Sequence, residues 1–336
     1  MAVLRLGTAS GGRTSVANRL LRDRRLPILV TALLLIALYW FGAYRYSFDG
    51  QVASNLLINN AYLIVVAVGA TFVILTGGID LSVGSVVGFS TVLLSLLVTK
   101  YHWPLWPAGL IVLAVGTTGG ALMGGMVHYF RVQPFIATLT GLFLFRGLSL
   151  MLTKDSVQVD DKTVASIAQF HIPLPGGVFL SVGAAVSIAV VAIAAVVLHG
   201  TRFGRRVYAL GGNEQSSLLM GLPVARTKIA VYAISGFCSA LAGLVFVLYI
   251  QSGNPRAAIG MELDAIAAVV IGGTLLTGGV GYVVGSLLGV LLIGLIKTLI
   301  SAEGTLNSWW IKIATGALLL IFILLQRIVS ARKLKE

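Results

Sequence analysis

Long apolar runs separated by short polar segments make up most of this chain. A membrane crossing needs about 20 predominantly apolar residues, and ten runs approach or reach that length. The pattern therefore predicts an all-α polytopic membrane protein with about ten transmembrane helices. The runs lie at 26–41, 61–76, 80–99, 104–127, 134–153, 178–198, 229–250, 263–280, 283–300 and 309–326.

Basic side chains gather in three of the polar segments: 1–25, 200–228 and 328–336. Basic residues concentrate in cytoplasmic segments of membrane proteins, so we expect all three in the cytoplasm. This divides the chain into a basic N-terminal arm (1–25), a membrane domain (26–327) and a basic tail (328–336). The opposite side then receives acidic residues: Asp49, Asp155, Asp160, Asp161, Glu262 and Glu303.

Composition supports the membrane assignment and narrows the chemistry. With 57% hydrophobic and 10% charged residues, the chain has too little polar surface for a soluble domain. The net charge of +13 is explained by segments that set orientation and meet anionic lipid, so it indicates no nucleic-acid partner. A single cysteine, Cys238, excludes an internal disulfide, and the scattered histidines lack metal-ligand spacing.

The most polar interior segment, 200–228, contains signals for a short helix. Asn213 can cap it, Glu214 suits its positive N-terminal end, and Gly221 can stop it. The helix would have about two turns, with an apolar side formed by Leu218, Leu219 and Met220. A solvated basic loop and a rigid knob that docks into a cytoplasmic partner both fit this pattern.

An internal repeat links the two halves of the chain. Residues 76–88 align without a gap to 277–289, which makes Gly84 and Gly285 equivalent. Such duplication is typical of transporter folds. Glycines in these runs predict broken or closely packed helices near a pathway. Whether the two copies are parallel or inverted stays open.

Two further polar segments, 154–177 and 251–256, fall on the predicted outer side. Each is either a connector or a landing surface for an extracytoplasmic partner. The chain contains no phosphate-binding loop, nucleophile elbow or zinc-helix motif. We therefore expect no catalytic residues, metal or cofactor in this chain alone.

Four stretches resemble the ribose-type carbohydrate permeases of bacterial ABC importers: 67–85, 201–221, 263–279 and 304–314. The similarity extends from about 26 to 327, and the last stretch most resembles permeases of galactofuranose importers. Gln215 and Ser216 depart from the small residues of the general coupling pattern.

The resemblance implies a permease subunit in the bacterial inner membrane that carries a monosaccharide of the galactofuranose or ribose type. ATP would be bound and hydrolysed by a partner, the cytoplasmic ABC ATPase. Further implied partners are a periplasmic sugar-binding protein and a second permease, either homologous or another copy. The residues implied in ATPase coupling are Asn213, Glu214, Ser217 and Gly221.

Polar residues within or beside the apolar runs are candidates for the translocation pathway. Asp80 either faces a cavity or partner inside the membrane, or caps a helix at the membrane edge. Asn59 and Asn60 either meet sugar hydroxyls at the outer mouth or cap the second span. The full candidate set is Asn59, Asn60, Asp80, Ser82, Gly84 and Gly285.

Two rival functions remain at this point. A proton-coupled secondary transporter would use Asp80 as its proton carrier and would need no ATP. A membrane-embedded lipid enzyme would need clustered polar catalytic groups at one membrane face, and the sequence offers none.

Overall fold

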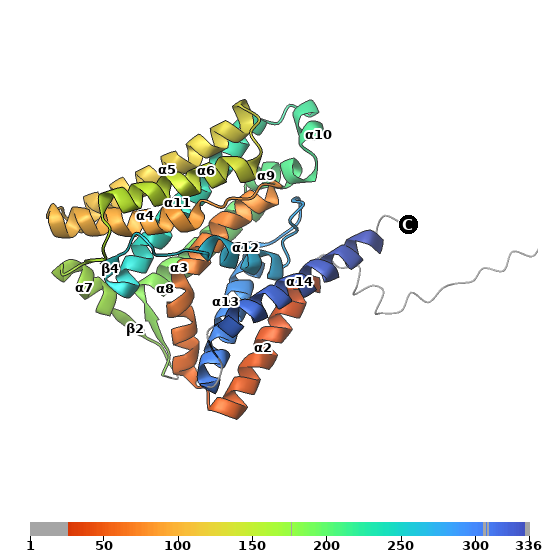
Figure 1. Ribbon diagram of the computed structural model, residues 1–336. Coiled ribbons are helices and arrows are strands. Elements are labelled where there is room, and N and C mark those ends of the chain that lie inside the picture. Colours follow the sequence, from red (N-terminus) through yellow and green to blue (C-terminus); the bar gives the residue numbers. More distant parts are fainter. Residues whose placement is uncertain (1–25, 176, 305–306, 308, 333–336) are drawn as a thin grey trace, which may run out of the picture.

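The computed structural model describes residues 26–175, 177–304, 307 and 309–332; the predicted arm at 1–25 lies outside the described residues. Helices make up most of this part of the chain (Figure 1). They are α2 (Leu26–Tyr46), α3 (Gly50–Leu75), α4 (Val83–Ser95) with its π-helical extension η1 (Leu96–Lys100), α5 (Leu105–Tyr129), α6 (Pro134–Leu152), α7 (Lys162–Gln169), α8 (Val182–Gly200), α9 (Arg202–Gly212), α10 (Glu214–Leu219), α11 (Val224–Ile250), α12 (Met261–Ile271), α13 (Val283–Glu303) and α14 (Trp309–Arg332).

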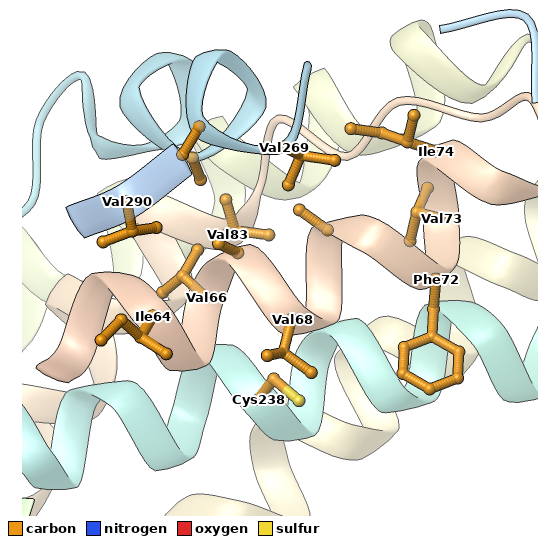
Figure 2. Packing of buried hydrophobic residues seen from close by; sticks show 14 of the residues in the cluster. Ile64, Val66, Val68, Phe72, Val73, Ile74, Val83, Cys238, Val269 and Val290 are labelled. Atoms are coloured by element: carbon orange, nitrogen blue, oxygen red, sulfur yellow. The ribbon is translucent and has the colours of Figure 1, made fainter. Parts of the chain in front are cut away.

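Helix α3 is the centre of the core. Asp49 starts it, because its carboxylate accepts hydrogen bonds from the backbone N–H groups of Gln51 and Val52 at 3.0 and 3.2 Å. From Asn60 to Leu75 nearly every residue of α3 is buried, as expected for a helix that is apolar all round. Figure 2 shows α3 between α11, which carries Cys238, and the α12–α13 pair, which carries Val269 and Val290.

Within the described residues, eight helices are long and apolar enough to cross a membrane: α2, α3, α4 with η1, α5, α6, α8, α11 and α13. The apolar part of α14, Trp309–Leu324, is shorter. The expected helical, polytopic architecture is therefore confirmed, with eight candidate spans among the described residues where the sequence predicted about ten. α14 also continues past the expected domain boundary at 327, as far as Arg332, and residues 333–336 lie outside the described part.

The prediction of a continuous span at 263–280 was wrong. α12 has only 11 residues and ends at Ile271. Beyond it, Gly273, Gly278 and Gly279 have φ angles of +92°, +84° and +74°, which no continuing right-handed helix accommodates. The run at 80–99 forms one span, α4 with η1, which starts three residues later than predicted, at Val83.

Each copy of the internal repeat is therefore a helix end, a glycine turn and a new helix. The first turn joins α3 to α4, and the second joins α12 to α13. The turns touch each other, because the N–H of Gly279 donates a hydrogen bond to the carbonyl of Leu75 at 2.9 Å.

Two small antiparallel sheets lie at the end of the molecule opposite α10 (Figure 1). In the first, β1 (Val157–Gln158) pairs with β4 (Ser252–Gly253). In the second, β2 (His171–Pro173) pairs with β3 (Phe179–Ser181). The β1–β4 sheet joins the two polar segments that the sequence places on the outer side.

Candidate functional site

The short helix α10 has the bounds that its local signals predict. The side-chain oxygen of Asn213 accepts a hydrogen bond from the N–H of Ser216 at 2.8 Å, which caps the first turn. Gly221 follows the helix with a φ of +74°, a conformation that favours glycine. Ser217 is buried and donates to the carbonyl of Asn213 at 2.9 Å.

The segment 200–228 contains more helix than predicted, since α9 precedes α10. Thr201 begins α9 by accepting from the N–H of Gly204 at 3.2 Å. An ion pair then ties α10 to α11, because the Lys228 Nζ lies 2.7 Å from a carboxylate oxygen of Glu214. The segment therefore contains two consecutive helices, α9 and α10, and α10 is paired to α11.

An apolar tip projects from this helix pair. Leu219 is 90% exposed, and Leu218 and Met220 are also exposed. Figure 1 shows α10 standing out from the body of the molecule. Three adjacent exposed apolar side chains on a rigid knob are typical of a protein-docking surface.

The C-terminal end of α9 contacts both repeat turns. A Cβ atom at Gly211 would overlap the carbonyl oxygen of Leu75 and would lie 2.5 Å from the N of Gly279. The Tyr208 hydroxyl donates to the carbonyl of Gly281 at 2.8 Å. Burial, with a smaller contribution from Tyr282, raises the pKa of Tyr208 to about 12, so this donor stays protonated at neutral pH. Helix α9 and the two repeat turns therefore meet at one junction.

Asp80 lies just after the first repeat turn and is buried. One carboxylate oxygen accepts from the N–H and the hydroxyl of Ser82, at 2.9 and 2.6 Å. The other accepts from the hydroxyl of Ser235 on α11 at 2.7 Å. The N-cap of α4 is Ser82 and not Asp80. The Asp80 carboxylate is enclosed between Ser82 and Ser235 of α11. Tyr232, also on α11, is buried beside this group, and its hydroxyl has no hydrogen-bond partner among the described residues.

The two equivalent glycines of the repeat, Gly84 and Gly285, each lie in close contact with a different neighbouring segment. A Cβ at Gly84 would overlap a carboxylate oxygen of Glu262 and lie 2.7 Å from the carbonyl oxygen of Ala258. A Cβ at Gly285 would overlap the carbonyl oxygen of Gly272, where α13 crosses α12. Close backbone approach of this kind is what small residues permit between membrane helices.

The two asparagines point in different directions. Asn59 is exposed, whereas Asn60 is buried and donates to the carbonyl of Leu56 at 2.8 Å. Asn60 also fills the space beside Gly294 of α13. Because α3 begins at Gly50, neither residue caps it, so that interpretation was wrong.

Two charged groups inside the helical body escaped the sequence analysis. Asp264 on α12 pairs with Lys297 of α13 and Lys312 of α14, at 3.2 and 3.0 Å. Arg146 on α6 donates to the carbonyls of Pro255 and Ala257, both at 2.8 Å. Arg146 could have been noticed in the sequence, because it is the only charged residue in the apolar run 134–153. The Asp264 pairs join residues 33 and 48 positions apart, which no local pattern reveals.

Within the described ranges, no group of three or more His, Cys, Asp or Glu side chains is placed to hold a metal ion. The arrangement is a bundle of long apolar helices with one run, 263–280, broken by a glycine turn, buried polar contacts beside the repeat turns and an exposed helix, α10, at one end. A duplicated helical unit of this kind is typical of membrane transport proteins.

Comparison with known proteins places the chain within that class. Residues 52–323 match the family model described as branched-chain amino acid transport system / permease component. The inner membrane ABC transporter permease protein YjfF of Escherichia coli is 44% identical over 306 residues, covering 90% of this chain and 92% of that protein. The fructose import permease protein FruG of Bifidobacterium longum is 40% identical, covering 83% of each chain. The ribose import permease protein RbsC of Bacillus subtilis is 39% identical, covering 82% of this chain and 85% of that protein.

No solved structure gives a significant match. The chain belongs to the family of ABC-transporter permease components, as a multi-pass inner-membrane protein.

Proposed function

We propose that this chain is the permease subunit of an ABC importer for a monosaccharide, driven by ATP hydrolysis in a separate cytoplasmic ATPase. The observation that carries the proposal is α10, a capped and ion-paired knob whose tip exposes Leu218, Leu219 and Met220. Such a surface needs a partner. The printed names of the relatives, which are import permeases for ribose and fructose, support a sugar as cargo.

The proposed complex contains an ABC ATPase, a second permease of the same family or a second copy of this chain, and a periplasmic sugar-binding protein. Within it, Asn213, Glu214, Ser217 and Gly221 build the helix that meets the ATPase. The stretch 304–314 favours galactofuranose over ribose as the cargo, by its resemblance to permeases of galactofuranose importers.

For the path of the sugar we propose Asn59, Asn60, Asp80, Ser82, Gly84 and Gly285. The exposed Asn59 can contact a polar substrate directly. Asn60, Asp80 and Ser82 are buried in this conformation. They would therefore act when the glycine contacts at α4 and α13 rearrange.

Substitution at the tip of α10 tests the docking surface. Leu219→Asp should leave the fold unchanged, because the side chain is 90% exposed. It should weaken capture of the ATPase by a tagged permease on the order of tenfold or more, as for a central apolar contact. The measurement is the amount of ATPase co-purified with the permease, together with ATP-dependent sugar uptake.

The matched control for this test is Leu174→Asp, since Leu174 is an exposed leucine near the opposite end of the molecule. Normal ATPase capture by Leu219→Asp, or equal loss in the Leu174→Asp control, would remove the basis for assigning α10 this role.

Buried Asp80 also keeps a second function under consideration, a proton-coupled transporter that works without ATP. An acid inside a membrane protein is a plausible proton carrier. The two functions differ in their energy source, which can be measured directly.

A further inference from the structure

The segment between β4 and α12, residues 254–260, takes an unusual route into the helical body. It leaves the β1–β4 sheet and follows α4 toward that helix's first turn (Figure 1). Three glycine positions trace this route. A Cβ at Gly253 would lie 2.5 Å from the carbonyl oxygen of Thr91, and one at Gly88 would lie 3.0 Å from that of Ala257. The third position is Gly84, beside Ala258.

Arg146 holds this segment from the side of α6. Its Nη1 donates to the carbonyls of Pro255 and Ala257, each at 2.8 Å. Hydrogen bonds from a charged donor are about twice as strong as neutral ones. A charged side chain in an otherwise apolar membrane helix is costly unless it has polar partners such as backbone carbonyls.

Gly88 provides the room for this contact. A Cβ there would lie 3.0 Å from the Nη1 of Arg146 as well as from the carbonyl oxygen of Ala257. Both distances are shorter than an ordinary van der Waals contact, so a side chain at residue 88 would press on the segment and on the guanidinium. This arrangement fixes the segment to both α4 and α6.

The segment 254–260 leads directly into α12 and, through the second repeat turn, into α13. Helix α12 crosses α13 at Gly272 and Gly285. The following turn places Gly279 against Leu75 and Gly211, at the base of the cytoplasmic helices. One continuous stretch of chain thus links the β1–β4 sheet with the junction below α9 and α10.

We propose that Arg146 is a positioning residue for transport, which fixes the 254–260 segment so that binding of the extracytoplasmic sugar-binding protein is transmitted through α12 to the ATPase. The inference rests on the proposed function. Arg146 contacts neither sugar nor ATPase in this account. Its effect is on the transmission between them.

The test uses the complete complex in membranes: the permease, its partner permease, the ATPase and the binding protein. The measured quantity is the ATPase rate with sugar-loaded binding protein divided by the rate without it. Arg146→Met should reduce this stimulation on the order of tenfold, the size expected for loss of charge-assisted hydrogen bonds. The unstimulated rate should stay within about twofold, within the range of neutral substitutions.

Two variants and one control separate transmission from folding. Gly88→Ala should reproduce part of the loss of stimulation, because its methyl group would press on the carbonyl of Ala257 and on the guanidinium of Arg146. Arg146→Lys keeps one charged donor and should recover part of the stimulation. Gly147→Ala is the control, since a Cβ at Gly147 meets nothing within 4 Å, and it should behave as wild type.

Each outcome decides the inference. Full stimulation in Arg146→Met overturns it, and so does a proportional fall of stimulated and unstimulated rates. If Arg146→Met does not assemble, Gly88→Ala and Arg146→Lys decide in the same way. A wild-type complex that the binding protein does not stimulate would instead refute the proposed function, and the inference with it.

Discussion

Serine hydroxyls and one backbone N–H satisfy the carboxylate of Asp80, although the sequence around it is apolar. Ser82 and Ser235 supply three hydrogen bonds, at 2.6 to 2.9 Å. An isolated buried charge is costly, and a buried polar group without partners also destabilises a fold. At the scale of the residue, Asp80 therefore joins the start of α4 to the middle of α11.

Substitution of Asp80 distinguishes this joining role from a role of the charge itself. Asp80→Asn keeps an oxygen that can accept from Ser82 and adds an amide that can donate to Ser235, so near-normal uptake is expected. Asp80→Ala removes every bond and should destabilise the protein by about 1–3 kcal/mol for each buried partner left unsatisfied. Sugar uptake and thermal unfolding of the purified protein are the measurements. Loss of uptake in a stably folded Asp80→Asn variant would show that the negative charge is required.

At the scale of the element, local signals predicted α10 well and α12 poorly. Asn213 and Gly221 determine where α10 begins and ends through their own backbone contacts, which lie close in sequence. The end of α12 depends instead on glycines that pack against α13 and against the first repeat turn. The run at 263–280 has the hydropathy of a single span, because hydropathy contains no information on the close contact between Gly272 and Gly285. The Asp264 pairs with Lys297 and Lys312 were unpredictable for the same reason, since three different helices contribute to them.

The adjacent glycines at the end of α9 offer a matched pair for testing the junction. Gly211→Ala would place a methyl group against the carbonyl oxygen of Leu75, whereas Gly212→Ala meets nothing within 4 Å. Because overpacking typically costs about 1–3 kcal/mol, Gly211→Ala should lower the midpoint of thermal unfolding and reduce ATP-dependent uptake. Gly212→Ala should change neither. If both variants behave alike, the junction between α9 and the repeat turns has no part in coupling.

At the scale of the whole molecule, the polar and charged segments that the sequence singled out lie at two opposite ends. One end carries the β1–β4 sheet and the other carries α9 and α10 (Figure 1). Between them lie α3, α4 and α11, which are continuous, and α12, which ends at Ile271. The proposed ATPase and the proposed sugar-binding protein would therefore dock at opposite ends of the molecule.

The energy source is the most direct test of the account. The purified chain alone, placed in liposomes with a pH gradient, should move no sugar. Uptake should appear when the ATPase, the binding protein and the partner permease are added, with ATP on the side that bears residues 200–228. Gradient-driven uptake by the chain alone, abolished in Asp80→Asn, would contradict the account and establish a proton-coupled transporter in its place.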